Sequence, residues 1–263
     1  MYDFTYSKPS SLPDALKALS DDMEAKALAG GQTFIPVLKQ RLNKPSAVVD
    51  LSALGLSGIT SDGSHITIGA MTTHHDIAES AEIKAKIPGL AKMASWIGDN
   101  QVRHRGTIGG SLANNDPSAC YPAAVLAIGA VIHTDKRAIP ADEFFQGMFT
   151  TALGAGELIT KVVFPMPEKS NYEKFRNPAS RYAMVGVFVA KGPAGVRVAV
   201  TGAGQGGVFR HAAMEAALGA NWSADAVKDI VTPADGLNGD IHASPEYRAH
   251  LIGVMTKRAV AGA

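Results

Sequence analysis

Two glycine-rich turns, far apart along a chain of 263 residues, constrain its fold more than any other sequence feature. The first is Ala29-Gly30-Gly31-Gln32-Thr33, and the second is Thr107-Ile108-Gly109-Gly110-Ser111. Because glycine lacks a Cβ atom, such turns let backbone N–H groups approach an anion such as a phosphate closely. A single turn of this kind is more often an ordinary strand-to-helix connection, so the first turn alone is weak evidence for a binding site.

The surroundings of the second turn strengthen the case. It follows Arg103, Arg105 and Gly106 in a polar stretch over residues 98–116. Backbone donors there can cradle a pyrophosphate while arginine offsets its charge. The alternative is a surface loop with solvated arginines, but the apolar Ile108 and Leu112 indicate a packed segment. No Gly-Lys-Ser/Thr follows either turn, which excludes a Walker loop. As a pair, the turns predict a dinucleotide held between two subdomains.

The order of expected elements supports such a division. Residues 10–50 predict helix, strand, turn, helix and strand, with Ser11 capping the first helix and Thr33 beginning a second that carries Leu42 on its face. The central part predicts strands over 65–70, 130–134, 157–164 and 172–175, a short helix capped by Thr72 or Thr73, and helices over 88–96 and 117–127. The last third predicts strands over 183–190 and 196–201, then helices over 214–218, 224–230 and 245–260. A boundary is expected near residues 165–175.

Composition excludes several function classes. With 25 basic and 24 acidic residues, no global field draws the protein to nucleic acid or an anionic membrane. The single cysteine, Cys120, excludes an internal disulfide and an iron–sulfur cluster bound by this chain alone. The histidines show no chelating pattern, so we expect no metal site. The chain shows neither a signal peptide nor an apolar run of about 18 residues, which predicts a cytoplasmic protein without a membrane span.

Longer segments around the turns carry a specific resemblance. AGGQTFIPVLKQRLNKPSAVVDL and GDNQVRHRGTIGGSLANNDPSACYPAAVLAIGA resemble the paired FAD signatures of the medium, flavin-binding subunit of the carbon monoxide and xanthine dehydrogenase family of molybdenum hydroxylases. IGAMTTHHDI over 68–77 and SPEYRAHLIGVMTKRAV over 244–260 resemble that subunit too. The resemblance covers essentially the whole chain. It implies an α+β chain: a two-subdomain FAD-binding fold of the PCMH type over 1–170 (subdomains about 1–55 and 56–170), then a C-terminal domain over 171–263 in which helices pack on a small antiparallel sheet.

The resemblance also assigns residues to the cofactor site. The implied FAD contacts are Ala29, Gly30, Gly31, Gln32, Thr33, Phe34, Ile35, Pro36, Thr107, Ile108, Gly109, Gly110, Ser111, Asp116, Ile159, Arg176 and Tyr182. One position departs from the pattern: the register of the xanthine-oxidising members places an acidic residue at Cys120, where a thiol is a much weaker partner. Asp116 is the substitute, unless it only caps the helix expected from Pro117. Cys120 itself is expected to be a small buried residue.

The function implied is electron transfer without substrate oxidation by this chain. It would bind FAD non-covalently, receive electrons from two [2Fe–2S] clusters of a small partner subunit, and pass them to NAD, a quinone or oxygen. A large partner subunit would carry the molybdenum–molybdopterin cofactor, in a dimer of heterotrimers. The flavin carries the redox chemistry, so no residue of this chain is predicted to be a catalytic acid or base.

Three alternatives remain open at this point. A stand-alone flavin oxidase of the same FAD-binding fold class would often tether its flavin covalently through a histidine. An NAD-dependent dehydrogenase would use residues 202–207, which match G-x-G-x-x-G, but no strand ending in Asp or Glu follows at the required distance. The resemblance instead makes this segment a turn leaving the C-terminal sheet. A scaffold that has lost its cofactor is disfavoured by the intact glycine turns.

Overall fold

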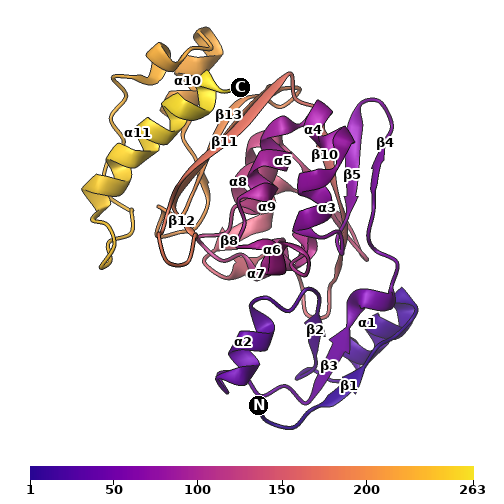
Figure 1. Ribbon diagram of the computed structural model, residues 1–263. Coiled ribbons are helices and arrows are strands. Elements are labelled where there is room, and N and C mark those ends of the chain that lie inside the picture. The colour runs from indigo at the N-terminus through magenta and orange to yellow at the C-terminus, as the bar shows by residue number, and fades with distance from the viewer.

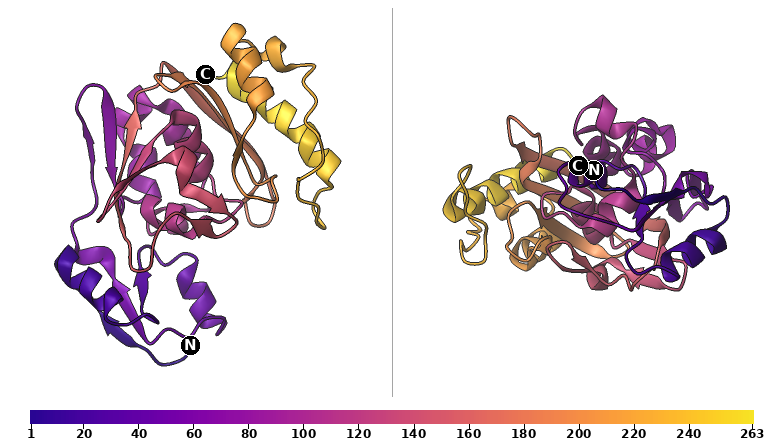
Figure 2. Two further views of the ribbon diagram at one scale, coloured as in Figure 1. Left: turned by 180° about the vertical axis from the view of Figure 1, so that it is seen from behind. Right: turned by 90° about the horizontal axis from the view of Figure 1, so that it is seen from below.

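The computed structural model describes residues 1–263 and shows three larger sheets, which divide the chain into successive parts, and one two-stranded sheet (Figure 1). The α+β architecture expected from the sequence is confirmed, including a C-terminal antiparallel sheet packed with helices. The N-terminal part and the C-terminal helices lie at opposite ends of the molecule (Figure 2). None of the helices combines the length and the hydropathy that crossing a membrane requires.

The N-terminal part is a parallel three-stranded sheet of order β1-β3-β2 with two helices. Its elements are β1 (Thr5–Ser7), α1 (Leu12–Ser20), β2 (Lys26–Leu28), α2 (Phe34–Lys39) and β3 (Ala47–Asp50), followed by the 3-10 helix η1 (Leu51–Ala53). Ser11 caps α1 as predicted, because its hydroxyl accepts from the Asp14 N–H at 3.3 Å. The prediction for Leu42 is wrong: α2 ends at Lys39, the backbone turns left-handed at Arg41 (φ 57°), and Leu42 is 74% exposed.

The central part contains a five-stranded antiparallel sheet of order β4-β5-β10-β6-β7. Its strands are β4 (Ile59–Ser61), β5 (His65–Gly69), β6 (Val131–Thr134), β7 (Ala138–Pro140) and β10 (Ile159–Pro165), and a separate hairpin is formed by β8 (Phe145–Gly147) and β9 (Thr150–Thr151). Its helices are α3 (His74–Glu79), α4 (Ala81–Lys86), α5 (Pro88–Ser95), α6 (Asn100–Arg103), α7 (Ile108–Asn114), α8 (Tyr121–Ile128) and α9 (Ala141–Phe144). The two short helices α6 and α7 occupy the stretch that the sequence predicted only as polar and glycine-bearing.

The helix expected from Pro117 begins later, at Tyr121. The reason is a tight turn at Asp116, whose carboxylate accepts from the Ser118 N–H at 2.8 Å and whose carbonyl accepts from the Ala119 N–H at 2.9 Å. Asp116 therefore caps a turn and not a helix. Once it starts, α8 is buried along its whole length.

The C-terminal part is an antiparallel sheet of order β11-β12-β13-β14 with helices on its outer face (Figure 1). Its elements are β11 (Lys169–Arg176), β12 (Ala183–Gly192), β13 (Gly195–Thr201), β14 (Phe209–Arg210), α10 (Ala212–Ala220), the 3-10 helix η2 (Ala224–Val227) and α11 (Pro245–Ala261). One face of β12 packs under α10 and α11 through Val185, Val187 and Val189, while Phe188 joins the central core beside α8. The sheet is thus buried on both faces, which fixes the two domains against each other.

The G-x-G-x-x-G segment does not open a nucleotide-binding helix. Gly202 leaves β13 with φ +82°, and the chain then forms β14 before α10 begins. The segment is a turn leaving the C-terminal sheet, as the resemblance predicted.

Candidate functional site

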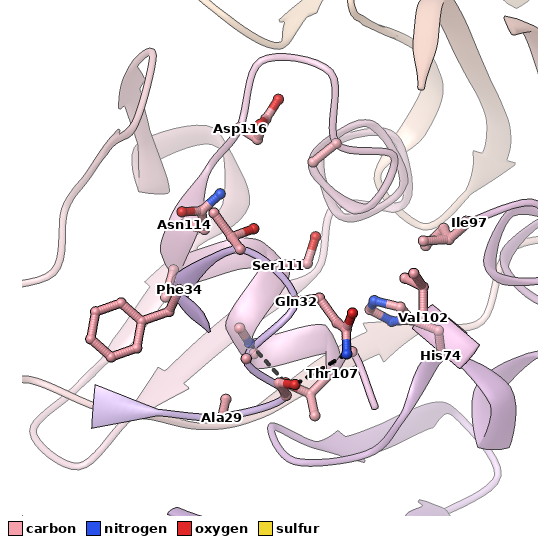
Figure 3. Close-up of a pocket in the computed structure, with 18 of the residues that line it drawn as sticks. Ala29, Gln32, Phe34, His74, Ile97, Val102, Thr107, Ser111, Asn114 and Asp116 are labelled. Carbon is pink, nitrogen blue, oxygen red and sulfur yellow. Dashed lines mark hydrogen bonds between the residues drawn. The ribbon is translucent and has the colours of Figure 1, made fainter. Parts of the chain in front are cut away.

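The two glycine turns meet at a cavity of about 700 Å³ between the N-terminal and central parts (Figure 3). A Cβ atom on Gly30 would lie 2.1 Å from the carbonyl oxygen of Arg105 and 2.7 Å from the Cα atom of Gly106. Gly110 approaches the first turn in return, since its Cβ would lie 3.4 Å from the Cβ of Ala29. Only glycine permits this approach, so the contact between the turns explains the residue type at Gly30.

The first turn presents a row of unused backbone donors. No hydrogen bond within the chain is donated by the N–H groups of Gly30, Gly31, Gln32 or Thr33. Gly31 has φ +73°, a left-handed conformation that glycine adopts without strain. Consecutive free N–H groups in a concave turn form an anion-binding surface, which is what a pyrophosphate requires.

The second turn contributes fewer free donors than the sequence suggested. The Gly109 N–H donates to the Ala70 carbonyl at 2.8 Å, and the Gly110 N–H donates to the Thr107 hydroxyl at 3.2 Å. What remains at the cavity are the Thr107 N–H and the Ser111 hydroxyl, neither of which has a partner in the chain. The second turn therefore offers a smaller, mixed set of donors on the opposite wall.

Most of the predicted cofactor contacts gather in this cavity. Its wall includes Ala29, Gly30, Gly31, Gln32, Thr33, Phe34, Thr107, Gly109, Gly110, Ser111, Asp116, Ile159 and Tyr182. These residues come from the N-terminal, central and C-terminal parts of the chain, and the fold alone brings them together.

Four predicted contacts, namely Ile35, Pro36, Ile108 and Arg176, lie outside the cavity wall. Ile35 packs against Gly31 from within α2, and Pro36 follows it in the same helix. Ile108 is fully buried in the core. The guanidinium of Arg176 stacks 4.4 Å from the ring centroid of Trp96. Ile35, Ile108 and Arg176 thus pack against other parts of the chain, whereas Pro36 is exposed on α2.

The arginines of the second turn also point elsewhere, contrary to the expectation that they offset phosphate charge. Arg103 donates to the Ile97 carbonyl at 2.9 Å, and Arg105 is exposed outside the cavity. Neutralisation of an anion in the cavity falls to backbone dipoles and to other cations in the wall.

Sequence reasoning missed several residues of the wall, among them Ala70, Met71, His74, Ile97, Val102, Asn114 and Lys174. The sequence could have identified His74 as a residue of the site, because it lies within the IGAMTTHHDI segment that resembles the family. The sequence indicates Lys174 less directly. It lies two residues before Arg176 on the same strand, and alternate residues of a strand share a face.

Three titratable side chains of the wall, His74, Glu157 and Tyr182, have shifted pKa values. Burial, and secondarily the charge of Arg103, lowers the pKa of His74 to about 4, so its imidazole is neutral near pH 7, and its Nδ1 has no partner. Hydrogen bonds from Arg137, at 3.0 Å from Nε to Oε1, lower the pKa of Glu157 to about 2 despite its burial. Burial, with the nearby Asp116, raises the pKa of Tyr182, which keeps the phenol protonated.

Cys120 is 5% exposed, which confirms the prediction of a small buried residue. It lies in the cavity wall beside Lys174, whose Nζ approaches its Sγ at 3.5 Å and donates to the Trp96 carbonyl at 2.8 Å. At the position where the resemblance expects an acid, this chain therefore places a thiol next to a buried cation.

The cavity fits a dinucleotide cofactor on three counts. Its two turns are closely packed at Gly30 and Gly109, where a Cβ would clash with backbone. Its first turn offers unused N–H groups, and its wall combines apolar residues such as Ile97 and Ile159 with a few polar groups. No group of three or more His, Cys, Asp or Glu side chains is placed to hold a metal ion.

Comparison with known proteins shows the same architecture. The family model described as "FAD binding domain in molybdopterin dehydrogenase" matches residues 2–167, and "CO dehydrogenase flavoprotein C-terminal domain" matches residues 170–263. The chain is 34% identical to the glyceraldehyde dehydrogenase medium chain of Sulfolobus acidocaldarius, over 98% of this chain and 97% of that one. It is 32% identical to the carbon monoxide dehydrogenase medium chain of Hydrogenophaga pseudoflava, over 98% and 96%.

Solved structures of similar proteins have the same fold as this chain. Reconstituted carbon monoxide dehydrogenase from Oligotropha carboxidovorans superposes with a TM-score of 0.89 at 32% identity, covering 98% of this chain and 96% of that chain. Quinoline 2-oxidoreductase from Pseudomonas putida superposes with a TM-score of 0.88 at 28% identity, covering 99% and 96%. The likeness extends over both domains and not only over the glycine turns.

Proposed function

Because this chain belongs to the family of FAD-binding subunits of molybdopterin-containing dehydrogenases, we propose that it carries electrons between partner subunits and an external acceptor. In this proposal a small partner with two [2Fe–2S] clusters supplies the electrons, and NAD, a quinone or oxygen receives them. A large partner holds the molybdenum–molybdopterin cofactor. The complex is a dimer of heterotrimers in the cytoplasm. The names of the relatives support the arrangement, since they describe medium chains and subunits of dehydrogenase complexes.

The contact between the two glycine turns is the observation that carries the proposal. We assign the FAD pyrophosphate to the free N–H groups from Gly30 to Thr33, with the Thr107 N–H and the Ser111 hydroxyl on the opposite wall. When bound, FAD supplies the redox chemistry, and the chain supplies binding and orientation.

The remaining wall residues bind and shield the rest of the cofactor. Ile97, Ile159 and Tyr182 offer apolar and aromatic surface at which a planar ring can stack. His74 is neutral and buried, so it adds no charge to this wall. The ring of the cofactor is expected to rest on these side chains while solvent reaches it past the half-exposed Tyr182.

The stand-alone oxidase is disfavoured by the names of the relatives. The glyceraldehyde dehydrogenase relative, matched over 97% of its length, is described as a medium chain and therefore as one chain of a larger assembly. His74 is the only histidine in the cavity wall, and it would be the site of any covalent tether.

Purification from the native host tests the proposal. We expect a yellow protein whose flavin is released by acid precipitation, with one larger and one smaller chain on the gel. Anaerobic addition of NAD, a quinone or oxygen to the reduced complex then identifies the acceptor by the return of the oxidised flavin spectrum. A chain that purifies alone and does not bind added FAD would refute the proposal. A flavin that remains attached after denaturation would favour the oxidase.

A further inference from the structure

Lys174 is a buried cation without an acidic partner. Only two cationic side chains are buried in the chain, those of Arg248 and Lys174. Arg248 pairs with Asp240 at 2.7 Å, whereas Lys174 takes part in no ion pair. A buried charge that lacks an opposite charge is strongly unfavourable, so its retention suggests that something outside the protein chain supplies the counter-charge.

The contacts of Lys174 satisfy its hydrogen bonding only in part. One proton goes to the Trp96 carbonyl at the end of α5, where a cation also complements the helix dipole. The second neighbour is the Cys120 sulfur, a weak acceptor at 3.5 Å. Capping α5 accounts for one donor, but it explains neither the third proton nor the position of Lys174 in the cavity wall.

The acids of the same cavity are engaged elsewhere. The carboxylate of Glu157 is held by Arg137, Thr134 and the Gly154 N–H. The carboxylate of Asp116 accepts from the Ser118 N–H. Neither lies within ion-pair distance of the Lys174 ammonium, which leaves a positive charge facing the cavity.

The residue at position 120 decides whether the charge of Lys174 is neutralised. An aspartate at position 120 would lie against the Lys174 ammonium, because the Cys120 sulfur is only 3.5 Å from Nζ, and the pair would be neutral. A thiol occupies the same space without a carboxylate. The replacement that departs from the family pattern thus preserves a net positive charge in this wall.

We propose that Lys174 contacts the isoalloxazine ring of bound FAD and stabilises the reduced form of the cofactor. Because residue 120 is a cysteine and not an acid, the charge of Lys174 that produces this effect is not neutralised. The inference rests on the proposed function. FAD that takes up two electrons and one proton carries a negative charge on its ring, whereas oxidised FAD has a neutral ring. A nearby ammonium therefore favours the reduced form and raises the reduction potential. In this proposal Lys174 contacts the cofactor and stabilises its reduced form more than its oxidised form.

Two variants change the charge at Lys174 and are chosen to leave the chain folded. Lys174→Gln removes the charge but keeps a donor for the Trp96 carbonyl, and Cys120→Asp neutralises Lys174 without removing it. Lys161→Gln is the matched control, because Lys161 is an exposed lysine on β10 outside the cavity. Thermal denaturation of the full chain establishes that each variant is folded.

The measurement is the dissociation constant of oxidised FAD and of dithionite-reduced FAD, determined anaerobically for each purified full chain. We expect the ratio of reduced to oxidised dissociation constants to rise about tenfold in Lys174→Gln and in Cys120→Asp, equivalent to a potential about 30 mV lower. The ratio should not change in Lys161→Gln. A redox titration against indicator dyes gives the same shift independently of binding.

The outcomes separate the two proposals. If the wild-type chain does not bind FAD, the proposed function fails. If it binds FAD but the ratio is unchanged in both variants, only the role of Lys174 is refuted. Equal weakening of both redox forms, together with weaker ADP binding, would place Lys174 at the phosphates and would also overturn the inference.

Discussion

Replacing Gly30 by alanine tests the contact between the turns most directly. The added Cβ would lie 2.1 Å from the Arg105 carbonyl oxygen and 2.7 Å from the Gly106 Cα. Both neighbours are backbone atoms, so no side-chain rotation relieves the clash, and the two turns must separate by about 1 Å to restore an ordinary contact. Overpacking of this kind costs about 1–3 kcal/mol. Since both turns are assigned to one pyrophosphate, FAD affinity should fall about 10- to 100-fold.

The assay is titration of the purified full chain with FAD, followed by quenching of flavin fluorescence. Gly206→Ala is the matched control, because a Cβ there meets no atom within 4 Å and the residue belongs to the G-x-G-x-x-G segment. We expect Gly206→Ala to bind FAD as the wild type does. The reasoning is refuted if Gly30→Ala retains wild-type affinity in a folded chain, or if Gly206→Ala loses as much.

Two further predictions concern stability. The unfolded chain protonates His74 near its ordinary pKa of 6.5 and the folded chain only at about 4, so folding stability is complete above about pH 6.5 and declines as the pH falls toward 4. The decline between about pH 8 and pH 5 is about 2 kcal/mol, and urea denaturation at several pH values should show a flatter profile for His74→Gln. Asn115→Ala should destabilise the chain by about 1–3 kcal/mol, because the Asn115 amide donates to the carbonyls of Gly147 and Thr150 at 2.8 and 2.9 Å. Denaturation midpoints with an unchanged m-value would check this, and a loss below about 0.5 kcal/mol would contradict it.

Local features were predictable because their causes lie within a few residues. Ser11 and Thr73 cap helices through hydroxyls that accept an N–H three residues later, and this geometry needs no distant partner. Gly31 is glycine because of its own backbone angle. The strands β12 and β13 and the helix α11 follow their hydrophobic patterns in the same way, whereas the helix predicted over 224–230 is the shorter 3-10 helix η2 and β14 was not predicted. The resemblance of the glycine turns indicated the family before any tertiary contact was known.

Features that depend on distant segments required the structure. The sequence marked both glycine turns, but only the fold brings Gly30 against the Arg105 carbonyl and leaves the first turn with the free donors. The start of α8 at Tyr121 depends on the turn at Asp116, whereas the sequence predicted a helix that begins at Pro117.

The basic residues Lys174 and Arg176 of β11 show most clearly what the sequence determines and what depends on the tertiary structure. The sequence selected Arg176, and alternation along the strand would place Arg176 and Lys174 on one face. The pairing of β11 with β12 shifts register between Phe175 and Arg176, however, and such an irregularity redirects the side chain that follows it. Arg176 consequently stacks on Trp96, and Lys174 enters the cavity. The sequence by itself determined that a cation lies on this strand; strand register, which is set by contacts with a distant neighbour, decided which one faces the cofactor site.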